Sequence, residues 1–184
     1  SLDRLIREDL NAAHEAFSPV EIVKLERFRM AQYLIISAEP EDDSIARMQK
    51  WAKQNGLESA AMIGCDVPKL TVEQQTVYGL RGYMSAVVLP ESFTGKCQGV
   101  REAWQETGKY AHITVREPMK APFVLIPNAY KAIQKHIEDN AIRHACIEGQ
   151  LSCFEYVHVI DGTEYMDIYI AVDMLTPGGE TVTL

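Results

Sequence analysis

The sequence predicts an α+β fold made of a duplicated strand-helix-strand-strand unit. The units share an antiparallel sheet, with two helices on one face and a cleft between the repeats. Three observations support this. The same succession of strand-like and helix-like apolar spacings occurs twice along the chain. Each copy has one helical stripe followed by two strand-like runs. An Asp-Gly turn joins the last two runs, which is typical of an antiparallel hairpin.

The composition is that of an ordinary globular domain. The chain has 184 residues, of which 47% are hydrophobic and 24% charged. It contains no run of about 18 apolar residues, as a membrane-spanning helix would need, and we expect a cytoplasmic location. The formal net charge of -8 argues against direct binding of nucleic acid, because such binding depends on Lys and Arg neutralising phosphates.

Residues 1–19 and the first repeat, 20–90, come first along the chain. Residues 1–19 are expected to form a helical linker or a packing helix, because their apolar residues recur at helical spacing. The first repeat is expected to contain a strand, a helix with one apolar stripe and a stop at Gly56, and two further strands. The expected bounds are 22–36 for the first strand, 43–55 for the helix, and 60–66 and 77–89 for the last two strands.

A connection, 91–107, leads into the second repeat, 108–174. Trp104 lies in this connection and has two equal readings, as a core residue or as an aromatic residue of a lid. The second repeat is expected to contain a strand at 108–115, a helix at 128–139, and strands at 152–160 and 165–173. A flexible tail is expected at 175–184.

Glu155 is the residue of greatest interest. In a strand, alternate residues share a face, so Glu155 lies with Cys153 and Val157 on an apolar face, opposite Phe154 and Tyr156. A buried, unpaired charge is costly. Glu155 is therefore expected either to form an internal salt bridge or to serve a pocket for a cationic ligand. Burial favours its protonated form, so binding of a cation would release a proton.

No metal or cofactor is expected. The four cysteines, at positions 65, 97, 146 and 153, form no C-x-x-C pair. The five histidines lack the spacing of metal ligands, and no nucleophile motif accompanies them. His158 is expected to be a surface or packing residue. These patterns identify no catalytic residue.

Three segments carry a resemblance to a known family: Gly108-Lys109-Tyr110-Ala111, Ile126-Pro127-Asn128-Ala129-Tyr130 and Cys153-Phe154-Glu155-Tyr156. With the predicted architecture, they resemble the GyrI-like small-molecule-binding domain. This domain is also the C-terminal effector-binding domain of AraC/XylS-family and some MerR-family bacterial transcription regulators. The resemblance covers about residues 20–174.

The resemblance implies a small-molecule effector, cationic and hydrophobic, bound in an acidic aromatic pocket with Glu155 at its base. In the predicted register, Met62 faces Glu155 across the cleft. Tyr83 is the best aromatic candidate of the first repeat, and Met119 would be an adaptable wall residue. Trp104 and Tyr33 are candidate rim residues. Tyr165 and Tyr169 are expected to point away from the pocket.

The function that the resemblance implies is multidrug-type ligand sensing for transcription regulation. DNA contact would come only through a domain absent from this chain, no membrane partner is expected, and a homodimer is left open. Two alternatives remain. One is a stand-alone hydrolase of strained electrophiles, in which Glu155 acts with an aromatic residue. The other is a gyrase-inhibitor-like module that binds protein through its outer surface.

Overall fold

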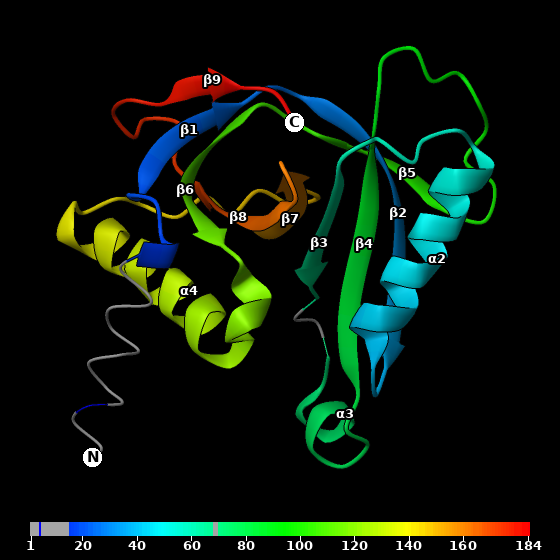
Figure 1. Ribbon diagram of the computed structural model, residues 1–184, viewed down its shortest axis with the longest axis horizontal. Helices are drawn as coiled ribbons and strands as arrows, with labels where there is room; N and C mark the ends of the chain where they lie inside the picture. The colour runs from blue at the N-terminus through cyan, green and yellow to red at the C-terminus, as the bar shows by residue number, and fades with distance from the viewer. Residues whose placement is uncertain (1–3, 5–14, 68–69) are drawn as a thin grey trace. The chain divides into compact units, whose positions relative to one another are not determined.

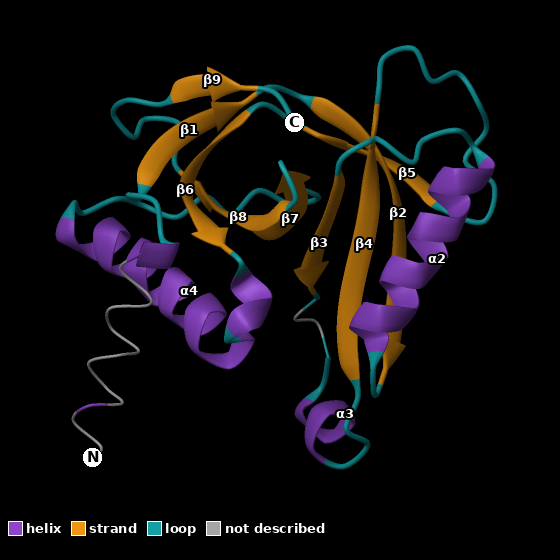
Figure 2. Ribbon diagram, in the orientation of Figure 1, coloured by secondary structure: helices purple, strands orange, loops and turns teal. Residues whose placement is uncertain are grey.

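The computed structural model describes residues 4, 15–67 and 70–184, and the chain divides into two compact units (Figure 1). Unit 1 comprises Ser1–Glu26 and Gly108–Thr183, and unit 2 is built mainly from Arg27–Thr107. Each unit contains a strand, a helix and two further strands, so the predicted α+β class is confirmed (Figure 2). None of the helices among the described residues is long and apolar enough to span a bilayer.

Unit 2 is a four-stranded antiparallel sheet with strand order β5-β2-β4-β3. One long helix, α2, lies along β2 and β4 (Figure 1). The elements are β2 (Phe28–Ser37), α2 (Pro40–Gln54), β3 (Met62–Asp66), the short α3 (Val72–Thr76), β4 (Arg81–Leu89) and β5 (Arg101–Gln105).

The core of unit 2 lies between α2 and the sheet, as the helical stripe predicts. Met48, Trp51 and Ala52 of α2 are buried against Ala31 of β2 and Val87 of β4. Burying apolar side chains of this size stabilises a fold by about 1.5 to 3 kcal/mol each. The sheet face of unit 2 that receives α2 is therefore fixed by the sequence pattern.

Unit 1 has the strand order β7-β8-β6-β1-β9, antiparallel except for the parallel pair β1 and β9. The elements are β1 (Glu21–Leu25), β6 (Gly108–Arg116), the 3-10 turn η1 (Pro118–Lys120), α4 (Pro122–Asp139), β7 (Cys153–Ile160), β8 (Thr163–Val172) and β9 (Glu180–Val182). Leu125, Ala129, Ile133 and Ile137 of α4 pack on the apolar face of β6 and β8.

Helix α4 begins six residues before the predicted start at residue 128, and Pro127 lies inside it. Proline usually marks the first turn of a helix, which favoured the later start. Here Pro122 occupies the first turn, and Pro127 removes one backbone hydrogen bond near the beginning of the helix. The side chain of Phe123, the residue whose carbonyl would have accepted that bond, is 94% exposed. Solvent access at this end makes the missing bond tolerable.

Other boundaries also differ from prediction. The predicted strand 22–36 is two strands, because β1 pairs with β6 whereas β2 pairs with β4 and β5. The connection 91–107 contains β5, and the expected flexible tail contains β9, which is paired with β1. Most of the expected helix at 1–19 lies outside the described residues. These pairings join segments far apart in sequence, which local patterns do not reveal.

The predicted hairpin between β7 and β8 is confirmed. Ile160 pairs with Thr163, so the loop has two residues. Asp161 and Gly162 have φ angles of 50° and 78°, and a type I′ turn needs positive φ at both of these positions. This turn sets the register that places Glu155 opposite Ile168 and Tyr156 opposite Asp167.

Candidate functional site

Glu155 lies on the face of β7 that is turned toward α4. Its carboxylate accepts a hydrogen bond of 2.6 Å from the Tyr130 hydroxyl, and the same hydroxyl is 3.6 Å from the Cys153 sulfur. Cys153 and Glu155 therefore share a face, as strand alternation predicts. In register, Glu155 lies opposite Ile168, which belongs to the core beneath α4. A half-buried carboxylate thus sits at an apolar surface.

Tyr130 stays protonated in this setting. Its pKa is raised far above the ordinary tyrosine value, first by burial and then by the negative charge of Glu155, with the two side-chain hydrogen bonds adding to the effect. A neutral phenol is a hydrogen-bond donor to the carboxylate without neutralising its charge. The Tyr130 hydroxyl therefore holds the Glu155 carboxyl in place without supplying a positive charge.

The sequence places Tyr130 by helix periodicity. Ile126, Tyr130, Ile133 and Ile137 recur at helical spacing, and the helix packs this side on the sheet. The ring fills apolar space while its hydroxyl reaches Glu155. Sequence analysis named Tyr130 only within a segment that carries the family resemblance and did not pair it with Glu155. The sequence feature that could have predicted this pairing is a tyrosine among apolar residues at helical spacing, because a buried hydroxyl needs a hydrogen-bond partner.

In unit 2, Tyr83 lies on the α2 side of β4, as strand alternation predicts. Ser85, two residues along, forms a 2.7 Å hydrogen bond with Ser44 of α2. Tyr83 is only 6% exposed, and its ring lies across Gly64 of β3, where any Cβ would meet it. Glycine at position 64 is thus what gives the Tyr83 ring its room.

Two further predicted residues share the α2 side of this sheet. Met62 lies opposite Val87 and packs against the unit 2 core. Tyr33 lies opposite Ser85, with the Arg47 guanidinium 5.1 Å from the centre of its ring. Tyr33, Met62 and Tyr83 therefore lie on one face of unit 2.

Trp104 and Met119 are more exposed. Trp104 lies on the edge strand β5, is 44% exposed and is covered by the Arg27 guanidinium at 3.8 Å from its ring centre, so it is not a core residue. Met119 lies in η1, just before α4, and is 58% exposed. Their roles as ligand-contacting residues stay predictions.

The opposite face of unit 1 carries the residues expected to point away from Glu155. Tyr169 stacks on Phe154, and Tyr165 stacks on His158. His158, expected at the surface or in packing, forms a 2.6 Å contact with Asp167. Sequence analysis did not single out Asp167. The sequence feature that could have identified Asp167 is a carboxylate within a strand whose alternate residues are apolar.

Among residues 4, 15–67 and 70–184, no group of three or more His, Cys, Asp or Glu side chains is arranged to hold a metal ion. Glu155, Tyr130 and Cys153 bring a carboxylate, a phenol and a thiol together on this face of β7.

No family model and no curated protein matches the sequence. Similarity appears among solved structures. SAV2435 bound to tetraphenylphosphonium has a TM-score of 0.50 and 15% identity, over 86% of this chain and 96% of that chain. The EcmrR C-terminal domain has a TM-score of 0.57 and 10% identity, over 85% of this chain and 98% of that chain. A hydrolase encoded by lin2189 from Listeria innocua has a TM-score of 0.55 and 7% identity, over 91% of this chain and 98% of that chain.

These identities are too low to carry over a function, but the coverage is nearly complete in both directions. The resemblance predicted from the sequence is therefore confirmed at the level of the fold. The chain has the GyrI-like α+β fold.

Proposed function

We propose that this chain is a small-molecule-binding domain that senses a lipophilic cation, with Glu155 as the residue that attracts the charge. The observation that carries the proposal is the half-buried Glu155 carboxylate held by the neutral Tyr130 hydroxyl. The domain would belong to a bacterial transcription regulator. Ligand occupancy would bias the orientation or dimerisation of a DNA-binding part outside this chain.

The physical basis is charge in an apolar setting. An attraction between opposite charges is several times stronger at a partly desolvated site than in bulk water. Aromatic rings add about 0.5 to 2 kcal/mol for each cation–π contact. Tyr83, Tyr33, Met62, Trp104 and Met119 stay predictions as ligand-contacting residues. Selectivity would then depend on the charge and size of the ligand.

The structural neighbours support this class of function. SAV2435 was solved with tetraphenylphosphonium, a lipophilic cation. EcmrR was solved both as its C-terminal domain and as a complex with DNA, and this chain covers 68% of the EcmrR chain in that complex, with a TM-score of 0.57. The fold of this chain therefore occurs both in a protein solved with a lipophilic cation and in a protein solved with DNA.

The test is calorimetric titration with methyltriphenylphosphonium and with its neutral analogue, triphenylphosphine oxide. We expect the cation to bind and the neutral analogue to bind at least tenfold more weakly. Glu155→Gln should weaken binding of the cation at least tenfold, about 1.4 kcal/mol, because the amide keeps the shape but carries no charge. Binding of the neutral analogue should change little.

Glu148→Gln is the matched control, because Glu148 is an exposed glutamate in the same unit. It removes the same charge from the molecule without touching the site. If Glu155→Gln and Glu148→Gln weaken cation binding equally, Glu155 has no specific role and the proposed site is wrong.

Hydrolysis is the second candidate function, since Tyr130 supplies the aromatic partner that the sequence alone did not identify. In such a reaction Glu155 would take a proton from a water molecule while the water oxygen bonds to an electrophilic carbon and the strained bond at that carbon breaks. The leaving atom would then take up the proton from Glu155. The raised pKa of Tyr130 makes it a weak acid at neutral pH. Turnover of a strained electrophile that is lost in Glu155→Gln would favour hydrolysis over sensing.

A further inference from the structure

A second cluster of ionisable side chains lies in unit 1, on the sheet face opposite α4. Asp167 of β8 contacts His112 of β6 at 2.7 Å through Oδ1 and His158 of β7 at 2.6 Å through Oδ2. The Thr114 hydroxyl also donates to Oδ1, at 2.5 Å. One carboxylate thus joins three neighbouring strands. We call His112, Asp167 and His158 the clamp.

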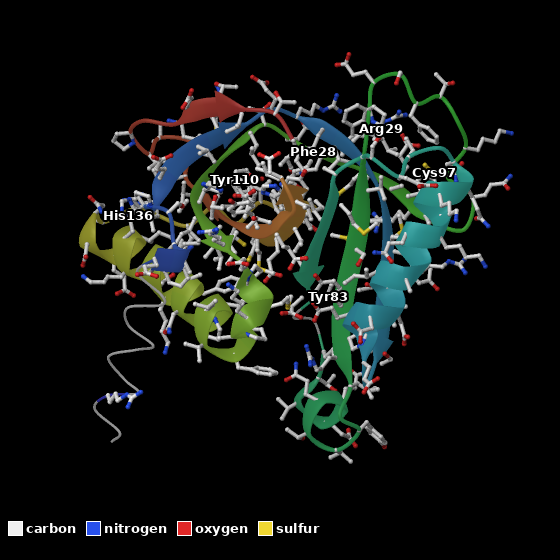
Figure 3. All side chains as sticks on the ribbon, viewed as in Figure 1. Phe28, Arg29, Tyr83, Cys97, Tyr110 and His136 are labelled. Atoms are coloured by element: carbon white, nitrogen blue, oxygen red, sulfur yellow. The ribbon has the colours of Figure 1, made fainter. Side chains whose placement is uncertain are left out.

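The clamp is largely shielded from solvent. The side chains of His112, Asp167 and His158 are 17%, 12% and 20% exposed. His158 stacks between Tyr156 and Tyr165, with ring centres 4.7 and 5.9 Å away. Figure 3 labels Tyr110, a buried residue on the same face of β6. A net charge here is partly removed from water and costs more than at the surface.

Asp167 is ionised at neutral pH. Burial by itself raises the pKa of this carboxyl, but the hydrogen bonds from His112 and Thr114, the charge of His112 and the hydrogen bond from His158 together hold it below its ordinary value. A carboxylate only accepts hydrogen bonds, so both imidazoles must carry hydrogen on Nε2. The next proton on either ring therefore goes to Nδ1.

The charge balance of the clamp depends on how many protons the two rings hold. With both rings neutral, the clamp carries one negative charge. One added proton gives a neutral group with an ion pair, and a second gives two imidazolium ions sharing one carboxylate. Histidine is the side chain whose charge ordinarily changes between about pH 5 and 8. The second proton places two imidazolium ions against one carboxylate, and these two positive charges repel each other in a site partly shielded from water.

Other groups on this face of unit 1 do not supply the missing negative charge. Glu21 of β1 lies opposite His112 in register but is exposed, and Arg116 at the end of β6 is exposed and positive. The pKa values of Tyr156 and Tyr169 are raised by burial and by Asp167, so these tyrosines stay neutral. The phenol of Tyr165 stacks on His158. Among the described residues of this face, Asp167 is therefore the carboxylate placed to balance both rings.

We propose that the clamp is an acid-sensitive latch that holds β7 on β8 and releases it when both histidines are protonated. β7 is bonded within unit 1 to β8 alone among the described strands. Its other face carries Glu155, so loosening β7 also disturbs the Glu155–Tyr130 contact. The consequence for ligand affinity rests on the proposed function, whereas the latch itself does not.

The test is amide hydrogen exchange of the ligand-free protein between pH 7.5 and 5.0, corrected for intrinsic exchange rates. We expect protection of β7 to fall about tenfold over this range, while the core strands of unit 2 keep theirs. His112→Gln and His158→Gln should each abolish the fall. Gln still donates a hydrogen bond to Asp167, and a clamp with a single imidazole cannot become net positive.

His144→Gln is the control, because His144 is an exposed histidine of unit 1 outside the clamp. It should keep the wild-type pH profile. An acid-induced fall that persists in both clamp variants would overturn the proposal, and so would a wild-type β7 whose protection does not change with pH. The pH dependence of β7 protection in the wild-type protein tests the proposal even if a variant folds poorly. Because no ligand is present, failure of the latch is distinct from failure of cation binding.

Discussion

The Glu155–Tyr130 contact is a hydrogen bond between a half-buried carboxylate and a phenol that stays protonated. A Lys or Arg partner would neutralise Glu155, whereas a phenol donates a hydrogen bond and leaves the negative charge. The contact also contributes to stability, since a hydrogen bond to a charged group is worth about 1.5 to 3 kcal/mol. Binding chemistry and stability thus depend on the same two residues.

Tyr130→Phe should change the alkaline stability of the protein. The raised pKa of Tyr130 means that the unfolded chain loses this proton near the ordinary tyrosine value while the folded chain keeps it. Stability is therefore lost as the pH rises above about 10, by about 1.4 kcal/mol per pH unit for this tyrosine. The variant should be less stable at pH 7, because the hydrogen bond is gone, and should show a shallower loss above pH 10.

Urea unfolding at several pH values between 7 and 11 measures this difference. Tyr78→Phe is the control, since Tyr78 is 64% exposed. Identical slopes for wild type and Tyr130→Phe above pH 10 would show that burial of Tyr130 does not control its ionisation.

The pairing of β3 with β4 places a glycine next to a large ring. Gly64 and Tyr83 lie diagonally across the two strands, on the side that faces α2 in unit 2. A Cβ at position 64 would lie 2.8 Å from Cζ of Tyr83, closer than carbon atoms pack. The Tyr83 ring can take this orientation because residue 64 on the neighbouring strand is a glycine and has no side chain there.

Gly64→Ala should lower the free energy of unfolding by about 1 to 3 kcal/mol, because the Tyr83 ring must move. In a Tyr83→Leu background the same change should cost at least 1 kcal/mol less, since the shorter side chain leaves room. Chemical denaturation of the four proteins completes this double-mutant cycle. Additive costs would mean that the alanine methyl does not displace the ring.

At the scale of the whole molecule, the net charge of -8 gives the protein a field that attracts cations at a distance. This field is screened by salt, because the Debye length shortens from about 30 Å at 0.01 M to about 3 Å at 1 M. Under the proposed function, Glu155 would act on the cation at contact distance, whereas the remaining acidic residues would act on the rate of encounter.

Raising the salt concentration from 0.02 to 0.5 M should therefore slow association of methyltriphenylphosphonium about fivefold. Its dissociation rate should change less than twofold, since contacts within the site are screened less. Stopped-flow fluorescence measures both rates, with triphenylphosphine oxide as the uncharged control. A salt effect carried mainly by dissociation would contradict long-range attraction.

The sequence by itself determined the duplicated strand-helix-strand-strand order, the apolar stripes of α2 and α4, the Asp161-Gly162 hairpin and the face on which Glu155 lies. These features depend on periodicities of 2 and 3.6 residues and on local turn chemistry, which neighbouring residues encode. Tertiary structure decided the division of 22–36 into two strands, the pairing of β9 with β1, the Tyr130–Glu155 bond and the clamp on Asp167. Each of these joins segments distant in sequence. Such contacts are selected by the packing and hydrogen-bonding needs of the whole fold, which no local pattern contains.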